Sequence, residues 1–222
     1  MREIFEAELT ALGDDLRAMA LRVEHGVTGA GRALAGANLQ LAETVIADDL
    51  EIDALERQLG ERCVHLLAQQ QPVATDLRVV VSALRMSATL ERMGDLARHI
   101  AEIARSRYPR SAVPAALTGT FAEMDVAAIR VASRIGTLLA SRDLALAESI
   151  EADDDLLDDL HADTFAAMLG SGWAGNAQQT VDVTLLGRYY ERFGDHGVSI
   201  ARRVVYLVRG DLLASEPLRL HT

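Results

Sequence analysis

Two blocks of sequence recur along this chain in the same order and at nearly the same separation. Residues 38–49 match residues 143–154, which lie 105 positions later and share Leu, Ala, Glu and two consecutive Asp residues with them. Residues 90–101 match residues 190–201, 100 positions later, and both blocks contain Glu-Arg-x-Gly-Asp. Such a repeat is typical of a duplicated structural unit, so we expect two homologous halves divided near residues 108–114. The second half should lack about five residues of its middle connection, where a loop absorbs a deletion.

Six segments of the chain place apolar residues at the spacing of an α-helix. In one of them Leu77, Val80 and Leu84 recur three and four residues apart, as on a single buried helical face. Asn38 and Asp143 stand where a helix N-cap belongs, each directly before such a pattern. The predicted helices cover residues 3–35, 39–70, 74–107, 115–140, 144–169 and 178–208.

The repeat and the helical spacing together predict an all-α fold. Residues 1–108 and residues 109–222 should each form a three-helix bundle, and the two bundles should be related by a pseudo-two-fold axis as one six-helix protein. A chain with only 4% aromatic residues and abundant Leu, Val and Ala suits helix-on-helix packing. Gly26, Gly29 and Gly31 lower the helix propensity of the first segment by up to ~1 kcal/mol each. They indicate either a kink or a face on which another helix packs closely.

Charge and composition exclude several classes of function. The chain has 33 acidic and 22 basic residues, and this balance argues against a general affinity for nucleic acid, because phosphate neutralisation needs clustered Lys and Arg. No run of about 20 apolar residues is present, and the first residues lack the basic-then-apolar order of a signal peptide. The sequence contains no nucleophile elbow, P-loop or dinucleotide fingerprint. We therefore predict a cytoplasmic protein that is not inserted in a membrane and is not an enzyme.

Each half carries two pairs of carboxylates one helical turn apart. Four residues bring a side chain back to within about 40° on an α-helix, so both members of a pair share one face. Like charges at this spacing disfavour the helix, whereas an oxygen-rich cluster suits magnesium, manganese or iron ions and, less well, zinc. A solvated helix face is the alternative interpretation. The candidate metal ligands are Asp49, Asp53, Glu91 and Asp95 in the first half, and Asp154, Asp158, Glu191 and Asp195 in the second.

Glycine and histidine residues near these pairs refine the hypothesis. Gly94 and Gly194 lie between the two acids of their helices. Glycine lowers the stability of a helix at such a position, and a close approach of another group would explain why it is present. Asp158 and His161 are spaced as in the Glu-x-x-His motif of di-iron bundles, but Glu56 stands at the position equivalent to His161. A carboxylate-bridged metalloenzyme is therefore the alternative function, and a purely structural helical protein is the third.

The repeated motif also resembles that of a known family. Glu-Arg-Met-Gly-Asp at residues 91–95 and Glu-Arg-Phe-Gly-Asp at residues 191–195 are similar to the duplicated motif of the PhoU family. Residues 66–78 are similar to that family's connection between its second and third helices, and the resemblance covers residues 5–208. It implies two three-helix bundles, a cytoplasmic homodimer, and metal ions held on the bundle surface by the eight acidic residues named above.

The resemblance further implies a function in phosphate homeostasis. Members of the PhoU family are accessory regulators of bacterial phosphate uptake and negatively regulate the phosphate-starvation response. They are thought to couple the ATPase of the phosphate ABC transporter to a sensor histidine kinase when phosphate is ample, so these two proteins are the expected partners. The halves differ at residues 50–51 and 155–156, and Gly197 stands where Ala is more usual. The two metal sites therefore need not be equal.

Overall fold

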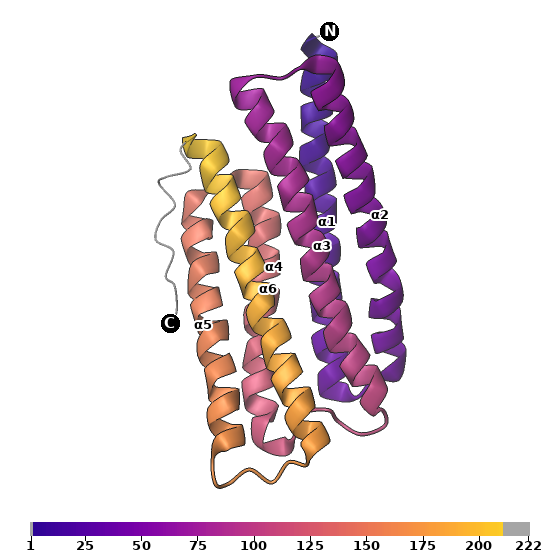
Figure 1. The fold of residues 1–222 in the computed structure, drawn as a ribbon, viewed down its shortest axis with the longest axis vertical. Coiled ribbons are helices and arrows are strands. Elements are labelled where there is room, and N and C mark those ends of the chain that lie inside the picture. Colours follow the sequence, from indigo (N-terminus) through magenta and orange to yellow (C-terminus); the bar gives the residue numbers. More distant parts are fainter. Residues whose placement is uncertain (1, 211–222) are drawn as a thin grey trace.

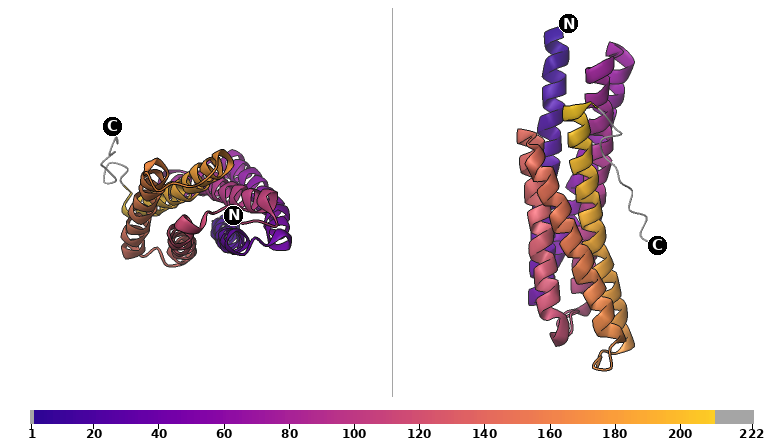
Figure 2. Two further views of the ribbon diagram at one scale, coloured as in Figure 1. Left: turned by 90° about the horizontal axis from the view of Figure 1, so that it is seen from below. Right: turned by 90° about the vertical axis from the view of Figure 1, so that its left-hand side faces the viewer.

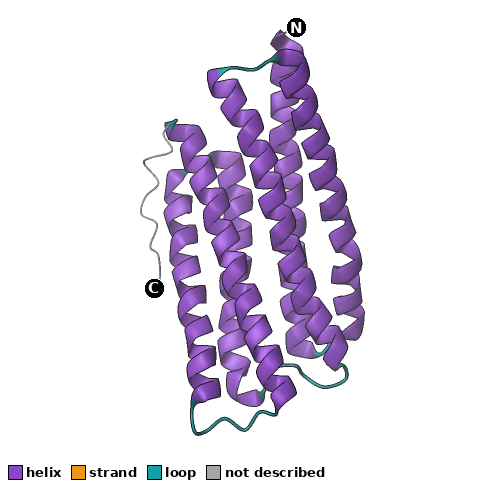
Figure 3. Cartoon of the chain, viewed as in Figure 1, coloured by secondary structure: helices purple, strands orange, loops and turns teal. Residues whose placement is uncertain are grey.

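The computed structural model of the chain describes residues 2–210 as a bundle of long helices (Figure 1). All regular structure within this range is helical (Figure 3), so the predicted all-α fold is confirmed. The fourth helix begins later than predicted because the chain first makes a 3-10 turn, η1, at Ala115–Leu117. Residues 211–222, which end the second predicted unit, lie outside the described range. The helices are α1 (Arg2–Gly36), α2 (Leu39–Gln70), α3 (Ala74–Arg107), α4 (Thr118–Ser141), α5 (Leu144–Leu169) and α6 (Ala177–Arg209).

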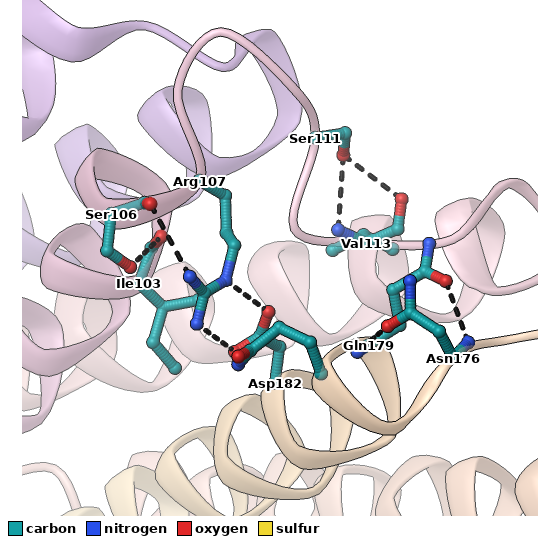
Figure 4. Close-up of polar contacts among 9 residues, drawn as sticks. Ile103, Ser106, Arg107, Ser111, Val113, Asn176, Gln179 and Asp182 are labelled. Atoms are coloured by element: carbon teal, nitrogen blue, oxygen red, sulfur yellow. Dashed lines mark hydrogen bonds and ion pairs between the residues drawn. The ribbon is translucent and has the colours of Figure 1, made fainter.

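Side-chain caps define the starts of three of these helices. The Asn38 side chain accepts a hydrogen bond from a backbone N–H in the first turn of α2 at 3.1 Å, and Asp143 does the same for α5 at 3.0 Å. Both predicted N-caps are thus confirmed. At the start of α6, Asn176 and Gln179 form a capping box that was not predicted, with both side chain–backbone distances at 3.0 Å (Figure 4). These bonds satisfy N–H groups that have no partner inside the helix.

The helices form two three-helix bundles that lie side by side. α1, α2 and α3 pack on one another, as do α4, α5 and α6. The halves meet along two helix pairs, α1 with α4 and α3 with α6, which lie in the middle while α2 and α5 lie outside (Figure 2). Buried apolar residues from all six helices form one continuous core. Within residues 2–210, no helix combines the length and the apolar character needed to cross a membrane.

The second half is shortened in a different place from the predicted one. α5 has 26 residues, whereas its counterpart α2 has 32, and the connection at residues 170–176 is longer than the one at residues 71–73. The prediction that the connection absorbs the deletion is therefore wrong, because the helix lost the residues. The Gly-Ser-Gly sequence at residues 170–172 explains this, since glycine disfavours continuation of a helix.

Two glycines of α1, Gly29 and Gly31, lie where neighbouring helices approach closely, and α1 runs without interruption from Arg2 to Gly36. A Cβ atom on Gly29 would lie 2.6 Å from the Val45 side chain of α2. A Cβ atom on Gly31 would overlap the Asp125 carboxylate of α4. Of the two interpretations of this glycine-rich segment, close packing is therefore confirmed.

A buried ion pair joins the two halves where α3 ends and α6 begins. Arg107 donates from Nε to Asp182 Oδ2 at 2.5 Å and from Nη2 to Oδ1 at 3.0 Å (Figure 4). Gln178 donates to the same Oδ1 at 3.0 Å. The Asp182 side chain is only 3% exposed, so its charge depends on this bidentate partner.

Replacing Arg107 with Met should lower the free energy of unfolding by about 3 kcal/mol, because Asp182 would stay buried without its cation. Urea denaturation followed by far-UV circular dichroism measures the change. Arg110→Met is the matched control, since Arg110 is exposed and should contribute less than about 0.5 kcal/mol. Equal losses in the two variants would contradict a specific role for the ion pair.

Asp125 on α4 is a carboxylate held in the contact between α1 and α4. It lies against Gly31, and its Oδ1 atom is buried with no hydrogen-bond partner among the described residues. Burial raises the pKa of Asp125 to about 6, and the nearby Tyr190 hydroxyl partly offsets that rise. The folded protein therefore keeps a proton on Asp125 at pH values where the unfolded chain has lost it.

We expect the free energy of unfolding to fall as the pH rises from about 4 to about 6, because the folded state binds more protons than the unfolded state in this window. The Asp125→Asn variant should lose about 1–3 kcal/mol of this pH-dependent decrease in the free energy of unfolding. It should also be more stable than the wild type at neutral pH. Urea denaturation at a series of pH values tests this. Glu123→Gln, on the exposed side of α4, should leave the pH dependence unchanged. A pH profile of the Asp125 variant parallel to that of the wild type would refute the assignment.

Candidate metal-binding carboxylate clusters

The eight predicted ligands form two clusters, one in each half. The acids of α2 face those of α3, and the acids of α5 face those of α6, so the carboxylates of each half act on one another electrostatically. The structure thus brings together the residues that the sequence predicted for each half. The first cluster comprises Asp49, Asp53, Glu91 and Asp95, and the second comprises Asp154, Asp158, Glu191 and Asp195.

Gly94 and Gly194 explain how the carboxylates come so close to the neighbouring helix. A Cβ atom on Gly94 would lie 2.9 Å from Asp49 Oδ1 and equally close to Ile52. A Cβ atom on Gly194 would overlap Asp154 Oδ1. Without these Cβ atoms the carboxylate of one helix rests against the backbone of the next, which confirms the predicted close approach.

In the first cluster the guanidinium of Arg98 forms ion pairs with the carboxylates. Arg98 on α3 donates from Nε to Asp49 Oδ2 at 2.7 Å and from Nη2 to Asp95 Oδ1 at 2.6 Å. Its remaining nitrogen, Nη1, donates to Glu102 at 2.8 Å. Burial raises the pKa of Asp49, and the Arg98 guanidinium opposes that rise. Arg98 therefore pairs with two of the four acids of the first cluster, one on each helix.

The second cluster is built differently. Val198 stands at the position equivalent to Arg98 and offers no donor. Asp154 Oδ1 and Glu191 Oε2 are buried and have no hydrogen-bond partner in the described part of the chain, although Arg188 donates to the other oxygen of Glu191 at 2.5 Å. Burial and, to a lesser extent, the neighbouring carboxylates together raise the pKa of Asp154 to about 7. Asp154 therefore lies among like charges, and Asp154 and Glu191 each keep one buried oxygen that no described side chain pairs with.

The two clusters differ in how well they suit a metal ion. Carboxylate oxygens are the ligands that hard cations prefer, and the second cluster offers four carboxylates with two buried, unpartnered oxygens. In the first cluster Arg98 already takes one oxygen each of Asp49 and Asp95, which belong to the predicted ligand set. Across residues 2–210, no three His, Cys, Asp or Glu side chains are arranged to hold one metal ion together. A shared ion therefore requires the carboxylates of the second cluster to turn toward one another.

The candidate histidines make other contacts. The His161 ring packs on Gly187 of α6 and lies 5.0 Å from the Phe165 ring, measured between ring centroids. His99 stacks on Tyr189 across the contact between α3 and α6, with ring centroids 5.1 Å apart. These contacts do not favour the Glu-x-x-His ligand set of a di-iron enzyme.

The repeat seen in the sequence corresponds to a repeated family domain. The PhoU domain matches this chain twice, at residues 16–104 and at residues 121–204. The chain belongs to the PhoU family. Phosphate-specific transport system accessory protein PhoU homolog 2 of Mycobacterium tuberculosis is 41% identical over 210 residues, which cover 95% of this chain and 99% of that protein. The PhoU homologue of Deinococcus radiodurans is 32% identical, over 95% of this chain and 99% of its own length.

Solved PhoU structures share the fold. The crystal structure of PhoU from Pseudomonas aeruginosa superposes with a TM-score of 0.82 at 30% identity, over 93% of this chain and 100% of that one. The phosphate transport system regulatory protein PhoU from Streptococcus pneumoniae has a TM-score of 0.83 at 23% identity, over 94% of this chain and 98% of that one. The predicted family and the predicted pair of three-helix bundles are therefore confirmed.

Sequence reasoning missed two features of these PhoU domains. Arg98 was not identified as part of the first cluster, although its replacement by Val198 in the repeat was a signal that could have found it. Asp153 was not singled out either; its side chain is 6% exposed and pairs with Arg130 at 2.8 Å and with Arg134, both on α4. The Arg98–Asp49 and Arg130–Asp153 pairs do not follow from spacing along one helix, because each joins two helices.

The same substitution at equivalent acids of the two PhoU domains should act in opposite directions. Asp49→Asn should lower the free energy of unfolding by about 1.5–3 kcal/mol, because it weakens a charge-assisted hydrogen bond from Arg98. Asp154→Asn should raise it by about 1–2 kcal/mol, because it removes a buried charge among like charges. Urea denaturation in EDTA at about pH 8, where both carboxyls of interest are ionised, measures the two effects.

Asp155→Asn serves as the control for this pair of variants. Asp155 follows Asp154 on α5 but is exposed, so its replacement should change the free energy of unfolding by less than about 0.5 kcal/mol. Similar losses at Asp49 and Asp154 would show that both clusters are neutralised in the same way and would contradict the structural difference described above.

Proposed function

We propose that this protein is a non-enzymatic accessory regulator of phosphate transport that acts in the cytoplasm. The observation that carries the proposal is the double match of the PhoU domain, which places both halves of the chain in one family. Relatives that are named phosphate-specific transport system accessory proteins match this chain over nearly their full length. The name of these relatives describes a protein that assists a transporter rather than one that catalyses a reaction.

In this proposal the protein restrains the phosphate-starvation response when phosphate is ample. It does so by linking the ATPase of the phosphate ABC transporter to a sensor histidine kinase, and it acts as a homodimer. The pair of bundles lying side by side (Figure 1) supports such a linking role, because the two are related but differ in their residues, as at Arg98 and Val198. One chain can thus engage two partners with different surfaces.

A bound metal ion is a second part of the proposal, and it concerns the second cluster. The two buried, unpartnered oxygens of Asp154 and Glu191 support it, as does the concentration of like charge that raises the pKa of Asp154. Asp158 and Asp195 complete the set of donors. An iron, manganese, magnesium or zinc ion would supply the positive charge that these carboxylates lack.

Capture of partners from cells at two phosphate levels tests the regulatory role. The tagged full chain should retain the transporter ATPase and the sensor kinase from phosphate-rich cells, and at least about fivefold less of them from starved cells, as expected for coupling between phosphate supply and binding. Quantitative mass spectrometry of the retained proteins gives the measurement. A tagged helical protein of similar size and net charge controls for nonspecific binding.

Deletion of the gene provides an independent readout of the same proposal. A reporter of the phosphate-starvation response should stay on in phosphate-rich medium when the protein is absent and should return to its repressed level on complementation. Retention of neither partner, together with an unchanged reporter, would rule out the proposed function.

A further inference from the structure

The first cluster carries a cation of its own. Arg98 uses Nε, Nη1 and Nη2 on three different carboxylates, so each nitrogen of its guanidinium donates one charge-assisted hydrogen bond. The Arg98 side chain is 27% exposed, while those of Asp49 and Asp95 are 7% and 20% exposed. The ion pairs therefore lie largely out of solvent, where electrostatic attraction is screened much less than at the surface.

A metal ion at this place would compete with Arg98 for the same atoms. Asp49 Oδ2 and Asp95 Oδ1 already accept from the guanidinium, and these two acids belong to the predicted ligand set. A fixed positive charge a few ångströms away also repels a second cation strongly when both are partly buried. Binding in the groove that Asp49, Asp53 and Arg98 line together would thus require Arg98 to give up its hydrogen bonds to Asp49 and Asp95.

The second half has an apolar residue at the position equivalent to Arg98. Val198 replaces Arg98, and its side chain is buried without any donor. Arg202 stands where the first half has Glu102, but it reaches outward to Glu151 at 3.4 Å, with both side chains about half exposed. Asp154 and Glu191 of the second cluster therefore each keep one oxygen that the described side chains do not use.

We infer that Arg98 is a built-in counter-cation that closes the first cluster to metal ions, so that the two PhoU domains of this chain are unequal and only the second is open to a metal. The inference deepens the proposed function and rests on it for metal binding at the second cluster. The closure of the first cluster rests on the hydrogen bonds of Arg98 alone. Arg98 is thus a specificity-determining residue for where a metal ion binds.

Manganese binding to the full chain, stripped with EDTA, tests the inference. Electron paramagnetic resonance of free Mn²⁺ counts bound ions in the wild type and in Arg98→Val, which installs the residue of the second half. The variant should bind about one further ion per chain, and Asp53→Asn in the same chain should weaken that added binding at least about tenfold. Added Mn²⁺ should also restore stability that Arg98→Val loses in EDTA.

Matched variants separate a new site from a general loss of charge. Arg105→Val removes an exposed arginine that borders the same groove and should add no Mn²⁺ binding. In the wild-type background Asp53→Asn should leave Mn²⁺ binding unchanged, whereas the equivalent Asp158→Asn should weaken it at least about tenfold. This last pair does not depend on whether Arg98→Val folds, which circular dichroism checks.

The outcomes distinguish the inference from the proposed function. Added binding in Arg98→Val with none in the wild type would support the role of Arg98 and reject metal binding at the second cluster. Wild-type binding that depends on Asp158, without any gain in a folded Arg98→Val, would overturn the inference and leave the proposed function standing. Loss of wild-type binding in Asp53→Asn would also overturn it.

Discussion

The contact between successive helices across a glycine is the constraint on which both carboxylate clusters depend. Gly94 and Gly194 let α2 approach α3, and α5 approach α6, until an aspartate of one helix touches the backbone of the next. A carboxylate placed there loses much of its hydration, and an uncompensated buried charge is costly. The same packing that holds each bundle together therefore places carboxylates where a nearby positive charge would stabilise them.

The two halves differ in the positive charge that they place beside these carboxylates. In the first, Arg98 binds three carboxylates and satisfies the cluster with a side chain of the same helix. In the second, Val198 leaves the acids to repel one another, and burial raises the pKa of Asp154 to about 7. The two clusters thus differ at this position, because an arginine links acids of two helices in the first and valine cannot do so in the second. Such inequality suits a regulator that contacts different partners with its two halves.

The two bundles are also held in a fixed relation. They share one core and meet along α1 with α4 and α3 with α6, so that the seams between α2 and α3 and between α5 and α6 both lie on the face shown in Figure 1. Arg107 and Asp182 join the halves at one end of the contact between α3 and α6, while Asp125 lies against Gly31 in the contact between α1 and α4. A change at one cluster can therefore reach the other through packed helices rather than through a flexible linker.

The sequence by itself determined the helices, their N-caps at Asn38 and Asp143, the duplication, and the acids that share one face, because all of these follow from spacing along a single helix. It placed the shortening of the second half in the connection rather than in the helix, because apolar spacing does not show at which turn a helix ends. Only the tertiary structure decided which acids are neutralised. Arg98 with Asp49, Arg107 with Asp182, and Arg130 with Asp153 each join two helices, and their meeting depends on helix register and rotation, which the sequence pattern leaves open.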